Sequence, residues 1–160
     1  MKLSDFMVGK AIVPKLKSQE RDAVITELVD SLVQAGCVPA AHKKEITQKI
    51  IEREKQGSTG IGKGIAVPHI KHPSVKQIVG TIGCSKEGVD FASLDKAPVY
   101  SVLLLISPPN NPDRHLEAME SLFSHLQREM FRKFLRQAET REEIEDLLQE
   151  ADESQNNNRL

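Results

Sequence analysis

The stretch STGIGKGIAVPH, residues 58–69, joins three glycines and two hydroxyl side chains to a histidine. A glycine-rich segment lets backbone N–H groups come close to a ligand, because glycine tolerates tight backbone geometry. A histidine such as His69 can take a proton, a metal ion or a phosphoryl group. The pattern therefore predicts chemistry at His69, and the rest of the chain must indicate which kind.

The two common nucleotide-binding motifs do not fit this stretch. A dinucleotide fingerprint reads G-x-G-x-x-G between a strand and a helix, whereas GIGKG follows a predicted helix and precedes a predicted strand. A P-loop requires a hydroxyl residue after its lysine, but Lys63 is followed by Gly64. Nucleotide binding is therefore weakly supported.

A metal centre in this region would draw on His69, His72, His115 and Cys84. Pro68 and Pro73 bracket the first two histidines and oppose the helix that would align them as ligands. The chain has no HExxH or CxxC spacing. We therefore expect no metal and no cofactor, and a metal-dependent hydrolase is kept as an alternative that predicts stoichiometric bound metal.

Phosphoryl transfer fits the available residue types best. A phosphoryl group on His69 needs a nearby cation, and Arg53 offers one with planar, bidentate geometry. His115 lies in the first turn of a predicted helix, and helix N-termini favour anions. The groups that could donate hydrogen bonds to the phosphate are two hydroxyls and the loop backbone: Ser58, Thr59, Gly60 and Gly62.

The predicted elements alternate in a way that indicates an α/β fold. Apolar residues at helical spacing predict a helix that ends at Gly36, and a second helix begins near Pro39 and ends at Gly57. The apolar run 99–107 predicts a central strand, with further strands at 75–85 and in GIAVP before His69. A short strand near Ile12 and a helix N-cap at Ser18 are also expected.

The C-terminal part of the chain predicts three helices. Asn111 can cap a helix that starts at Pro112. Another helix contains Phe131, and the last begins at a capping-box pattern of Thr140 with Glu143. We expect one domain over residues 1–151, a three-layer α/β/α arrangement with a mixed sheet between helices, and a flexible tail over residues 152–160.

Composition excludes several other classes of function. The net charge is −1 and hydrophobic residues make up 39% of the chain, which is typical of a globular domain and gives no basic footprint for nucleic acid. No apolar run approaches the roughly 20 residues of a membrane span, and the N-terminus has no apolar signal-peptide core. We expect a cytoplasmic protein without direct membrane insertion, and we interpret His42, His72 and His125 as surface residues.

Residues 53–69, REKQGSTGIGKGIAVPH, resemble the signature of the fructose/mannitol/nitrogen-regulatory class (type 2) of enzyme IIA domains of the bacterial phosphotransferase system. RHLEAMESL, which contains His115, resembles the second histidine motif of that family. Residues 3–36 resemble its N-terminal strand and helix. The resemblance extends to about Glu150.

The resemblance implies a role for each candidate residue. His69 matches the histidine that accepts a phosphoryl group from the histidine-containing phosphocarrier protein. Arg53 matches the arginine that stabilises the transferred group, and His115 the second histidine, which supports the reaction without carrying the phosphate. Ser58 and Thr59 match the hydroxyl pair beside the site. Such a protein is a stoichiometric carrier rather than a classical turnover enzyme.

The sequence leaves three functions open for such a domain. No transporter, enzyme IIB or carrier domain is fused to the domain in this sequence, which favours a nitrogen-regulatory protein acting on a regulatory target. The alternative is a sugar-specific enzyme IIA that passes phosphate to an enzyme IIB. The residue after the histidine is usually small in the family, whereas here it is Ile70, so a binding module that is not phosphorylated is a further alternative.

Overall fold

The sheet is organised around β5 (Val99–Ser107), the apolar segment predicted to be a central strand. In this computed structural model, residues 1–157 are described. One edge of β5 pairs with β4 in antiparallel fashion, the other edge pairs with β2 and β3 in parallel, and β1 forms a hairpin with β2. The bounds of the remaining strands are β1 Gly60–Gly62, β2 Ile65–Ala66, β3 His69–Lys71 and β4 Val79–Val89.

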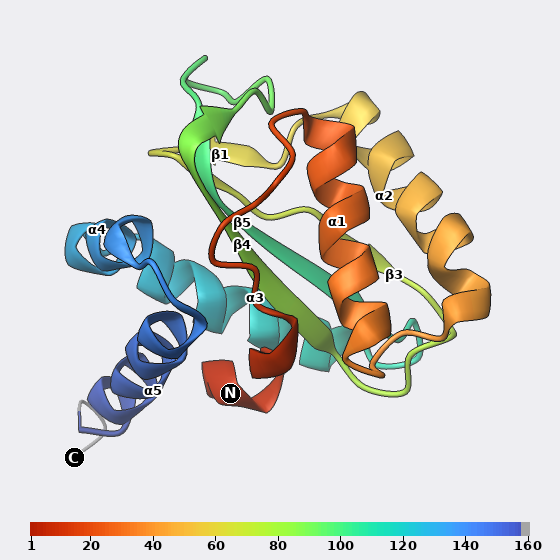
Figure 1. The fold of residues 1–160 in the computed structure, drawn as a ribbon. Helices are drawn as coiled ribbons and strands as arrows, with labels where there is room; N and C mark the ends of the chain where they lie inside the picture. The colour runs from red at the N-terminus through yellow and green to blue at the C-terminus, as the bar shows by residue number, and fades with distance from the viewer. Residues whose placement is uncertain (158–160) are drawn as a thin grey trace.

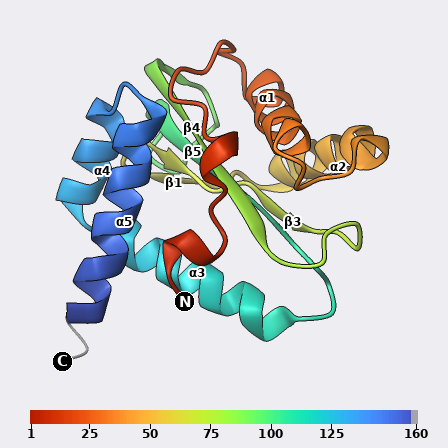
Figure 2. The same ribbon diagram turned by 60° about the horizontal axis from the view of Figure 1, so that its bottom comes forward.

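Two groups of helices cover the two faces of this sheet (Figures 1 and 2). Helices α1 and α2 lie on one face, and α3, α4 and α5 lie on the other. The structure is therefore the single-domain, three-layer α/β/α arrangement with a mixed sheet that the sequence predicts. The helices are α1 Arg21–Gln34, α2 Lys43–Gln56, α3 Pro112–Leu126, α4 Glu129–Gln137 and α5 Arg141–Asn157, with short 3-10 turns η1 Leu3–Asp5, η2 Gly9–Ala11 and η3 Ala40–His42.

The side chains of β5 point alternately to the two faces of the sheet, and this divides the hydrophobic core into two parts. Leu103 and Leu105 pack with α3, α4 and α5, whereas Val102, Leu104 and Ile106 pack with α1 and α2. All five are fully buried, as expected for a strand that is covered on both faces. Because successive side chains of a strand point to opposite faces, the same parity applies to the neighbouring strands.

The N-terminal segment runs along the free edge of β4 and differs from the sequence prediction. The strand expected near Ile12 is absent, and Val13 makes only an isolated bridge to Gly83. The N-cap expected at Ser18 is also wrong, because α1 starts at Arg21 with Glu20 at its N-cap. The backbone N–H of Ser18 instead donates to the Glu27 carboxylate at 3.1 Å.

The start of α3 agrees with the sequence prediction. The Asn111 side chain accepts a hydrogen bond from the Arg114 backbone at 3.3 Å, and Pro112 occupies the first helical position. Proline suits that position because its missing N–H would have no partner inside the helix. This start brings His115 into the first turn of α3.

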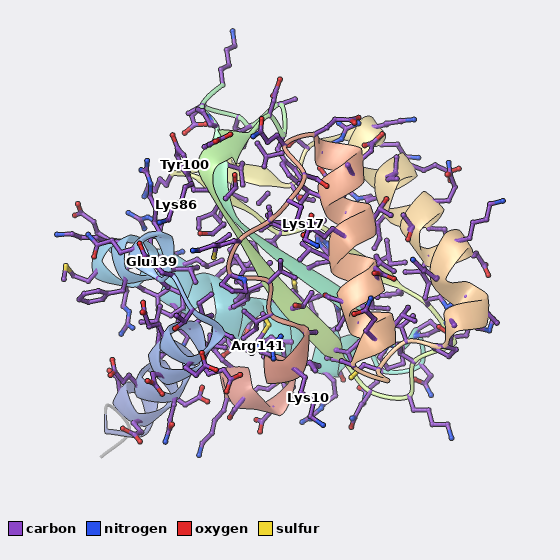
Figure 3. All side chains as sticks on the ribbon, in the orientation of Figure 1. Lys10, Lys17, Lys86, Tyr100, Glu139 and Arg141 are labelled. Atoms are coloured by element: carbon purple, nitrogen blue, oxygen red, sulfur yellow. The ribbon has the colours of Figure 1, made fainter. Side chains whose placement is uncertain are left out.

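Helix α4 and the residues just after it contact one end of the sheet through side chains that Figure 3 labels in part. The Arg136 guanidinium lies 3.6 Å from the centroid of the Tyr100 ring, which is a cation–π contact. The Lys86 ammonium lies 2.8 Å from the Glu139 carboxylate (Figure 3). Both partners of the ion pair are well exposed, so the pair adds little to stability.

Helix α5 continues beyond residue 151, where we placed the start of a flexible tail. The helix runs to Asn157, and residues 158–160 of that predicted tail lie outside the described residues. Asp152 is buried and its carboxylate accepts from the backbone N–H groups of Leu3 and Ser4, at 2.6 and 3.1 Å. This contact ties the last helix to the first turn of the chain, which local sequence patterns do not reveal.

Across residues 1–157, none of the helices combines the length and the apolar character that crossing a bilayer requires.

Candidate functional site

His69 begins β3 on an edge of the sheet, immediately after a break in the strand. The sequence predicts a strand GIAVP that ends at Pro68-His69, but β2 already ends at Ala66 and a further strand, β3, starts at His69. Pro68 has no N–H to donate and lies in the break between them. The Pro68 carbonyl still accepts from the Leu105 backbone at 3.0 Å, which keeps both parts beside β5. The break places the His69 ring near the start of α3.

One hydrogen bond sets the orientation and the tautomer of the His69 ring. Nδ1 lies 2.7 Å from the backbone carbonyl oxygen of Val67. A carbonyl oxygen can only accept, so Nδ1 carries the proton. In the neutral ring, Nε2 therefore holds the lone pair and can act as a nucleophile or a ligand. The side chain is half-buried, so its ring is still accessible.

His115 faces His69 from α3, as the sequence predicts. The two ring centroids are 5.8 Å apart, and the planes are tilted by 37°. His115 Nδ1 lies 2.6 Å from the Ser107 hydroxyl at the end of β5. Burial lowers the pKa of His115, and the nearby charges of His69 and Lys71 lower it further. The ring is therefore neutral over a wider pH range than an exposed histidine.

Ser107 and Lys71 belong to this site although the sequence reasoning did not include them. Lys71 lies two residues after His69 on β3, so its side chain shares the face that carries His69. Its charge acts on His115, and it is exposed. The period-2 pattern of a strand could have indicated Lys71, whereas Ser107 required knowledge of where α3 packs.

Arg53 lies in the last turn of α2, as predicted, but its guanidinium is directed to the end of that helix. Nη1 donates to the Gly57 carbonyl at 2.8 Å, and the side chain is exposed. This position compensates the negative end of the α2 dipole. Among the described contacts, none joins Arg53 to His69.

The hydroxyls of Ser58 and Thr59 are engaged in building the turn after α2. Thr59 donates through both its hydroxyl and its backbone N–H to the carboxylate of Glu54, which is buried. Ser58 donates its hydroxyl to the Phe91 carbonyl and accepts from the Gly60 N–H at 3.0 Å. The two residues therefore hold the loop in place. Glu54, which anchors Thr59, carried no sequence signal of this role.

The same turn is connected to His69 through the backbone. The Val67 N–H donates to the Thr59 carbonyl at 3.1 Å, and the Val67 carbonyl accepts from the His69 ring. The position of the His69 ring therefore depends on the conformation of residues 57–59. Gly60 follows directly and packs so closely on Ser93 that a Cβ would lie 2.3 Å from the Ser93 hydroxyl oxygen.

Gly62 lies at the other end of the β1–β2 hairpin, away from His69. Lys63 and Gly64 both have positive φ, at 58° and 78°, which is typical of a type I′ turn. Gly62 has φ of 92°. It aligns with Ser101 through Ile65, and His69 aligns with Leu105, so about 13 Å of β5 separates the two at ~3.3 Å per residue.

Two histidines that we interpreted as surface residues are buried. His72 is 2% exposed and His125 is 4% exposed. His72 follows β3 and packs toward α2, and His125 lies in the last turn of α3 beside Phe131. The prediction was wrong because the hydrophilic neighbours of both residues conceal the packing of the elements that carry them.

Comparisons with known proteins relate the sequence and the fold of the chain to one family. The model of the family "Phosphoenolpyruvate-dependent sugar phosphotransferase system, EIIA 2" matches residues 6–151. A fructose-specific EIIABC component from Bacillus subtilis is 37% identical over 95% of this chain, and a nitrogen regulatory protein from Bradyrhizobium diazoefficiens is 30% identical over 85%. This chain spans only 24% of the Bacillus protein, but 87% of the Bradyrhizobium protein.

A solved structure has the same fold over nearly its whole length. The nitrogen regulatory protein IIA-Ntr from Neisseria meningitidis superposes with a TM-score of 0.81 at 26% identity, covering 91% of this chain and 98% of that one. The IIA mannitol structure from Escherichia coli gives a TM-score of 0.72 at 24% identity, covering 88% of this chain and 97% of that one.

Proposed function

Because the chain belongs to the EIIA 2 family of the phosphoenolpyruvate-dependent sugar phosphotransferase system, we propose that it is a phosphocarrier that accepts a phosphoryl group on His69. The main support is the hydrogen bond from Nδ1 to the Val67 carbonyl, which leaves Nε2 as the reactive nitrogen. The accessible ring lies on a strand edge, where a partner protein can approach it.

The transfer needs little covalent chemistry from the protein. The lone pair of His69 Nε2 attacks the phosphorus of a phosphohistidine on the donor, and the electron pair of the broken P–N bond goes to the donor nitrogen. The proton stays on Nδ1, where the Val67 carbonyl stabilises the positive ring. Positioning and charge stabilisation therefore supply most of the rate enhancement.

His115 and two cations, Lys71 and Arg53, would stabilise the negative charge of the phosphoryl group. If the Ser107 hydroxyl donates to Nδ1 of the neutral His115 ring, Nε2 of that ring carries a proton that it can donate to a phosphoryl oxygen. Lys71 adds positive charge on the same face. We propose that Arg53 exchanges its bond to the Gly57 carbonyl for the phosphoryl oxygens, a stronger, charge-assisted contact.

Ile70 is compatible with phosphorylation of His69. Its side chain is partly buried against the core on the α1–α2 side, whereas His69 faces α3. A β-branched residue suits a strand, and it leaves the reactive face open. This arrangement favours the phosphocarrier over a binding module that has lost transfer.

We propose the histidine-containing phosphocarrier protein as donor and a regulatory target as the output. The nitrogen regulatory relatives support this output, because the match covers most of both proteins in the Bradyrhizobium and Neisseria cases. The phosphate source, phosphoenolpyruvate, is a cytoplasmic metabolite, so we also propose a cytoplasmic location.

A sugar-specific role is the second candidate. The fructose-specific Bacillus component has the higher identity, 37%. A solved Escherichia coli complex pairs enzyme IIA mannitol with phosphorylated enzyme IIB mannitol, and its IIA chain shares the fold with a TM-score of 0.70 at 23% identity. In this role the acceptor would be an enzyme IIB.

Intact mass spectrometry tests the phosphocarrier. The protein is incubated with phosphoenolpyruvate, enzyme I and the phosphocarrier protein. We expect the gain of one acid-labile phosphoryl group, its absence in His69→Gln, and its slower appearance in His115→Gln, since His115 supports transfer without carrying phosphate. Unmodified wild-type protein that is fully folded would refute the proposal.

Adding a fructose-type enzyme IIB to the phosphorylated protein then separates the regulatory role from the sugar-specific role, because only the sugar-specific role predicts rapid loss of the phosphoryl group to IIB.

A further inference from the structure

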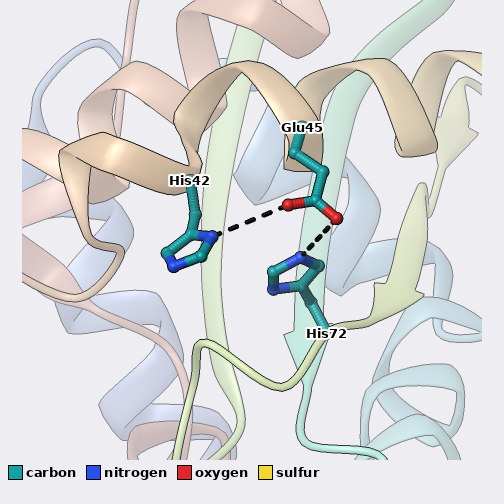
Figure 4. A group of neighbouring side chains, drawn as sticks. All are labelled: His42, Glu45 and His72. Carbon is teal, nitrogen blue, oxygen red and sulfur yellow. Dashed lines mark ion pairs between the residues drawn. The ribbon is translucent and has the colours of Figure 1, made fainter.

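Three side chains on the α2 side of β3 form a cluster that the phosphoryl site does not use. His42 ends η3, Glu45 lies in the first turn of α2, and His72 directly follows β3 (Figure 4). One nitrogen from each ring and one carboxylate oxygen all lie within 4.8 Å of one another. Figure 4 shows both rings directed at the Glu45 carboxylate, one at each oxygen.

The two nitrogen–oxygen distances in the cluster are longer than those of a good hydrogen bond and match the spacing of metal ligands. His72 Nε2 lies 3.4 Å from one Glu45 oxygen, and His42 Nδ1 lies 3.6 Å from the other. Good N–H···O hydrogen bonds span about 2.7–3.2 Å. Ligand atoms about 2.0–2.2 Å from a tetrahedral zinc ion lie roughly 3.4 Å from each other. Two of the three separations in the cluster therefore match those of ligands on one ion, and the third, between the two ring nitrogens, is within 4.8 Å.

His72 is held in place by a group behind it. Its side chain is 2% exposed, and Nδ1 accepts a hydrogen bond from the Ser74 backbone N–H at 3.1 Å and lies 2.7 Å from the Ser74 hydroxyl. Without an ion, Nε2 therefore carries the ring proton and faces the Glu45 carboxylate. When Nε2 binds a metal instead, the ring proton moves to Nδ1, where the Ser74 hydroxyl oxygen accepts it and the bond from the Ser74 N–H is given up. Such an outer partner orients most metal-binding histidines.

The other two members can adjust and leave one side open. The side chains of His42 and Glu45 are 45% and 52% exposed, so small rotations bring them to an ion and water can supply a fourth ligand. Lys49 is the competing cation, with its ammonium 3.4 Å from a Glu45 oxygen. Lys43, which follows His42, pairs instead with Asp30 at 2.7 Å.

We propose that His42, Glu45 and His72 bind one divalent transition-metal ion of the Zn²⁺ type, which clamps the start of α2 to the end of β3. Two imidazoles and a carboxylate are a donor set that zinc accepts in proteins. His69 and His72 belong to the same strand segment but serve opposite faces, so the clamp lies behind the phosphoryl site rather than in it.

Titration of tag-free, chelator-treated protein with Zn²⁺ alone tests the proposal. Calorimetry should give one saturable site, and Co²⁺ should develop the visible absorption of a tetrahedral centre. Zn²⁺ should raise the melting temperature, because an ion that binds only the folded state stabilises it by mass action. None of these measurements depends on phosphoryl transfer.

Variants locate the ion without disturbing the buried ring. His42→Ala and Glu45→Gln alter half-exposed side chains, and each should weaken Zn²⁺ binding at least about tenfold, the lower end of what losing one supporting partner costs. Lys49→Gln should strengthen binding, because it removes the competing charge. His69→Gln is the matched histidine control and should leave the Zn²⁺ affinity unchanged.

Two results would overturn the metal site. One is the lack of saturable Zn²⁺ binding by folded wild-type protein, which would make the cluster a set of weak polar contacts. The other is Zn²⁺ binding that survives in His42→Ala and Glu45→Gln but is lost in His69→Gln, which would place the ion between His69 and His115.

Discussion

At His69, the Val67 carbonyl fixes which nitrogen is reactive, and it does so through the backbone of the same strand segment. The geometry is local, since only Pro68 separates the two residues. The acceptor cannot be changed by any single side-chain substitution, so the tautomer is a property of the break between β2 and β3. In the neighbouring His115, burial and nearby charges instead lower the pKa of the ring.

The lowered pKa of His115 predicts a pH dependence of stability. Burial is the main cause, followed by the charges of His69 and Lys71, so the unfolded chain takes up this proton more readily than the folded protein. The free energy of unfolding should therefore fall as the pH drops from about 6.5 toward the lowered pKa of His115. Above about pH 6.5 the ring is neutral in both states, so this destabilisation is absent.

Urea unfolding of wild type and His115→Gln across this range measures the effect. The variant should lose less stability on acidification than the wild type, because glutamine does not titrate. Lys71→Met should raise the His115 pKa in an NMR titration while leaving it below that of an exposed histidine, since burial persists. Equal acid sensitivity of wild type and His115→Gln would contradict the assignment.

Arg53→Ala should slow phosphoryl transfer to His69 by about a hundredfold, the usual cost of losing one group that stabilises transition-state charge. The free energy of unfolding should change by less than about 1 kcal/mol, because the side chain is exposed and makes one contact to the Gly57 carbonyl. Quench-flow measurement of the labelled protein gives the rate. Arg53→Lys should recover only part of it, since lysine lacks the bidentate geometry. A normal rate in Arg53→Ala would remove this residue from the mechanism.

The β1–β2 hairpin serves the fold more than the reaction, although the sequence places it in the candidate site. Gly62→Ala forces a side chain onto a residue with φ of 92° and should cost about 1 kcal/mol of stability. Transfer to His69 should be nearly unaffected because the residue lies far along β5. Thermal unfolding and the phosphorylation assay separate the two effects.

Gly57→Ala is the matched control for this hairpin substitution. Gly57 has an extended φ of 175°, and a Cβ there would lie 3.8 Å from the nearest side-chain atom, so stability should hardly change. If Gly62→Ala slowed transfer while leaving the melting temperature intact, Gly62 would belong to the phosphate-binding loop, as the sequence suggests.

Short sequence patterns predict those elements whose formation depends only on neighbouring residues. The cap at Asn111 and the apolar run of β5 are read correctly, because helix starts and buried strands depend on neighbouring residues. The candidate pair His69 and His115 was also identified from its motifs, and the structure brings the two rings together. The burial of His72 was missed, because it arises from packing between elements far apart in the sequence.

Seen as a whole, the molecule uses the two faces of one short edge strand for different purposes. His69 and Lys71 face α3 and the proposed phosphoryl site, while Ile70 and His72 face α2. The strand can carry reactive groups at an edge because both its neighbours, α2 and β5, are packed into the core. Stability elsewhere in the fold therefore supports the position of His69.

The contact between Asp152 and the N-terminal turn makes a prediction about the whole domain. Its carboxylate accepts from the N–H groups of Leu3 and Ser4, and a hydrogen bond to a charged group contributes about 1.5–3 kcal/mol, net of the bonds to water that it replaces. Asp152→Ala should thus lower the free energy of unfolding by about 2 kcal/mol, measured by urea unfolding, because the buried Leu3 N–H loses its acceptor whereas water can reach the exposed Ser4. Asp146→Ala, on an exposed position of the same helix, is the control and should cost less than about 0.5 kcal/mol.

A chain shortened to residues 1–151 should lose at least as much free energy of unfolding as Asp152→Ala. Full stability of the shortened chain would instead support the predicted domain boundary at residue 151 and show that α5 needs no contact with the first turn.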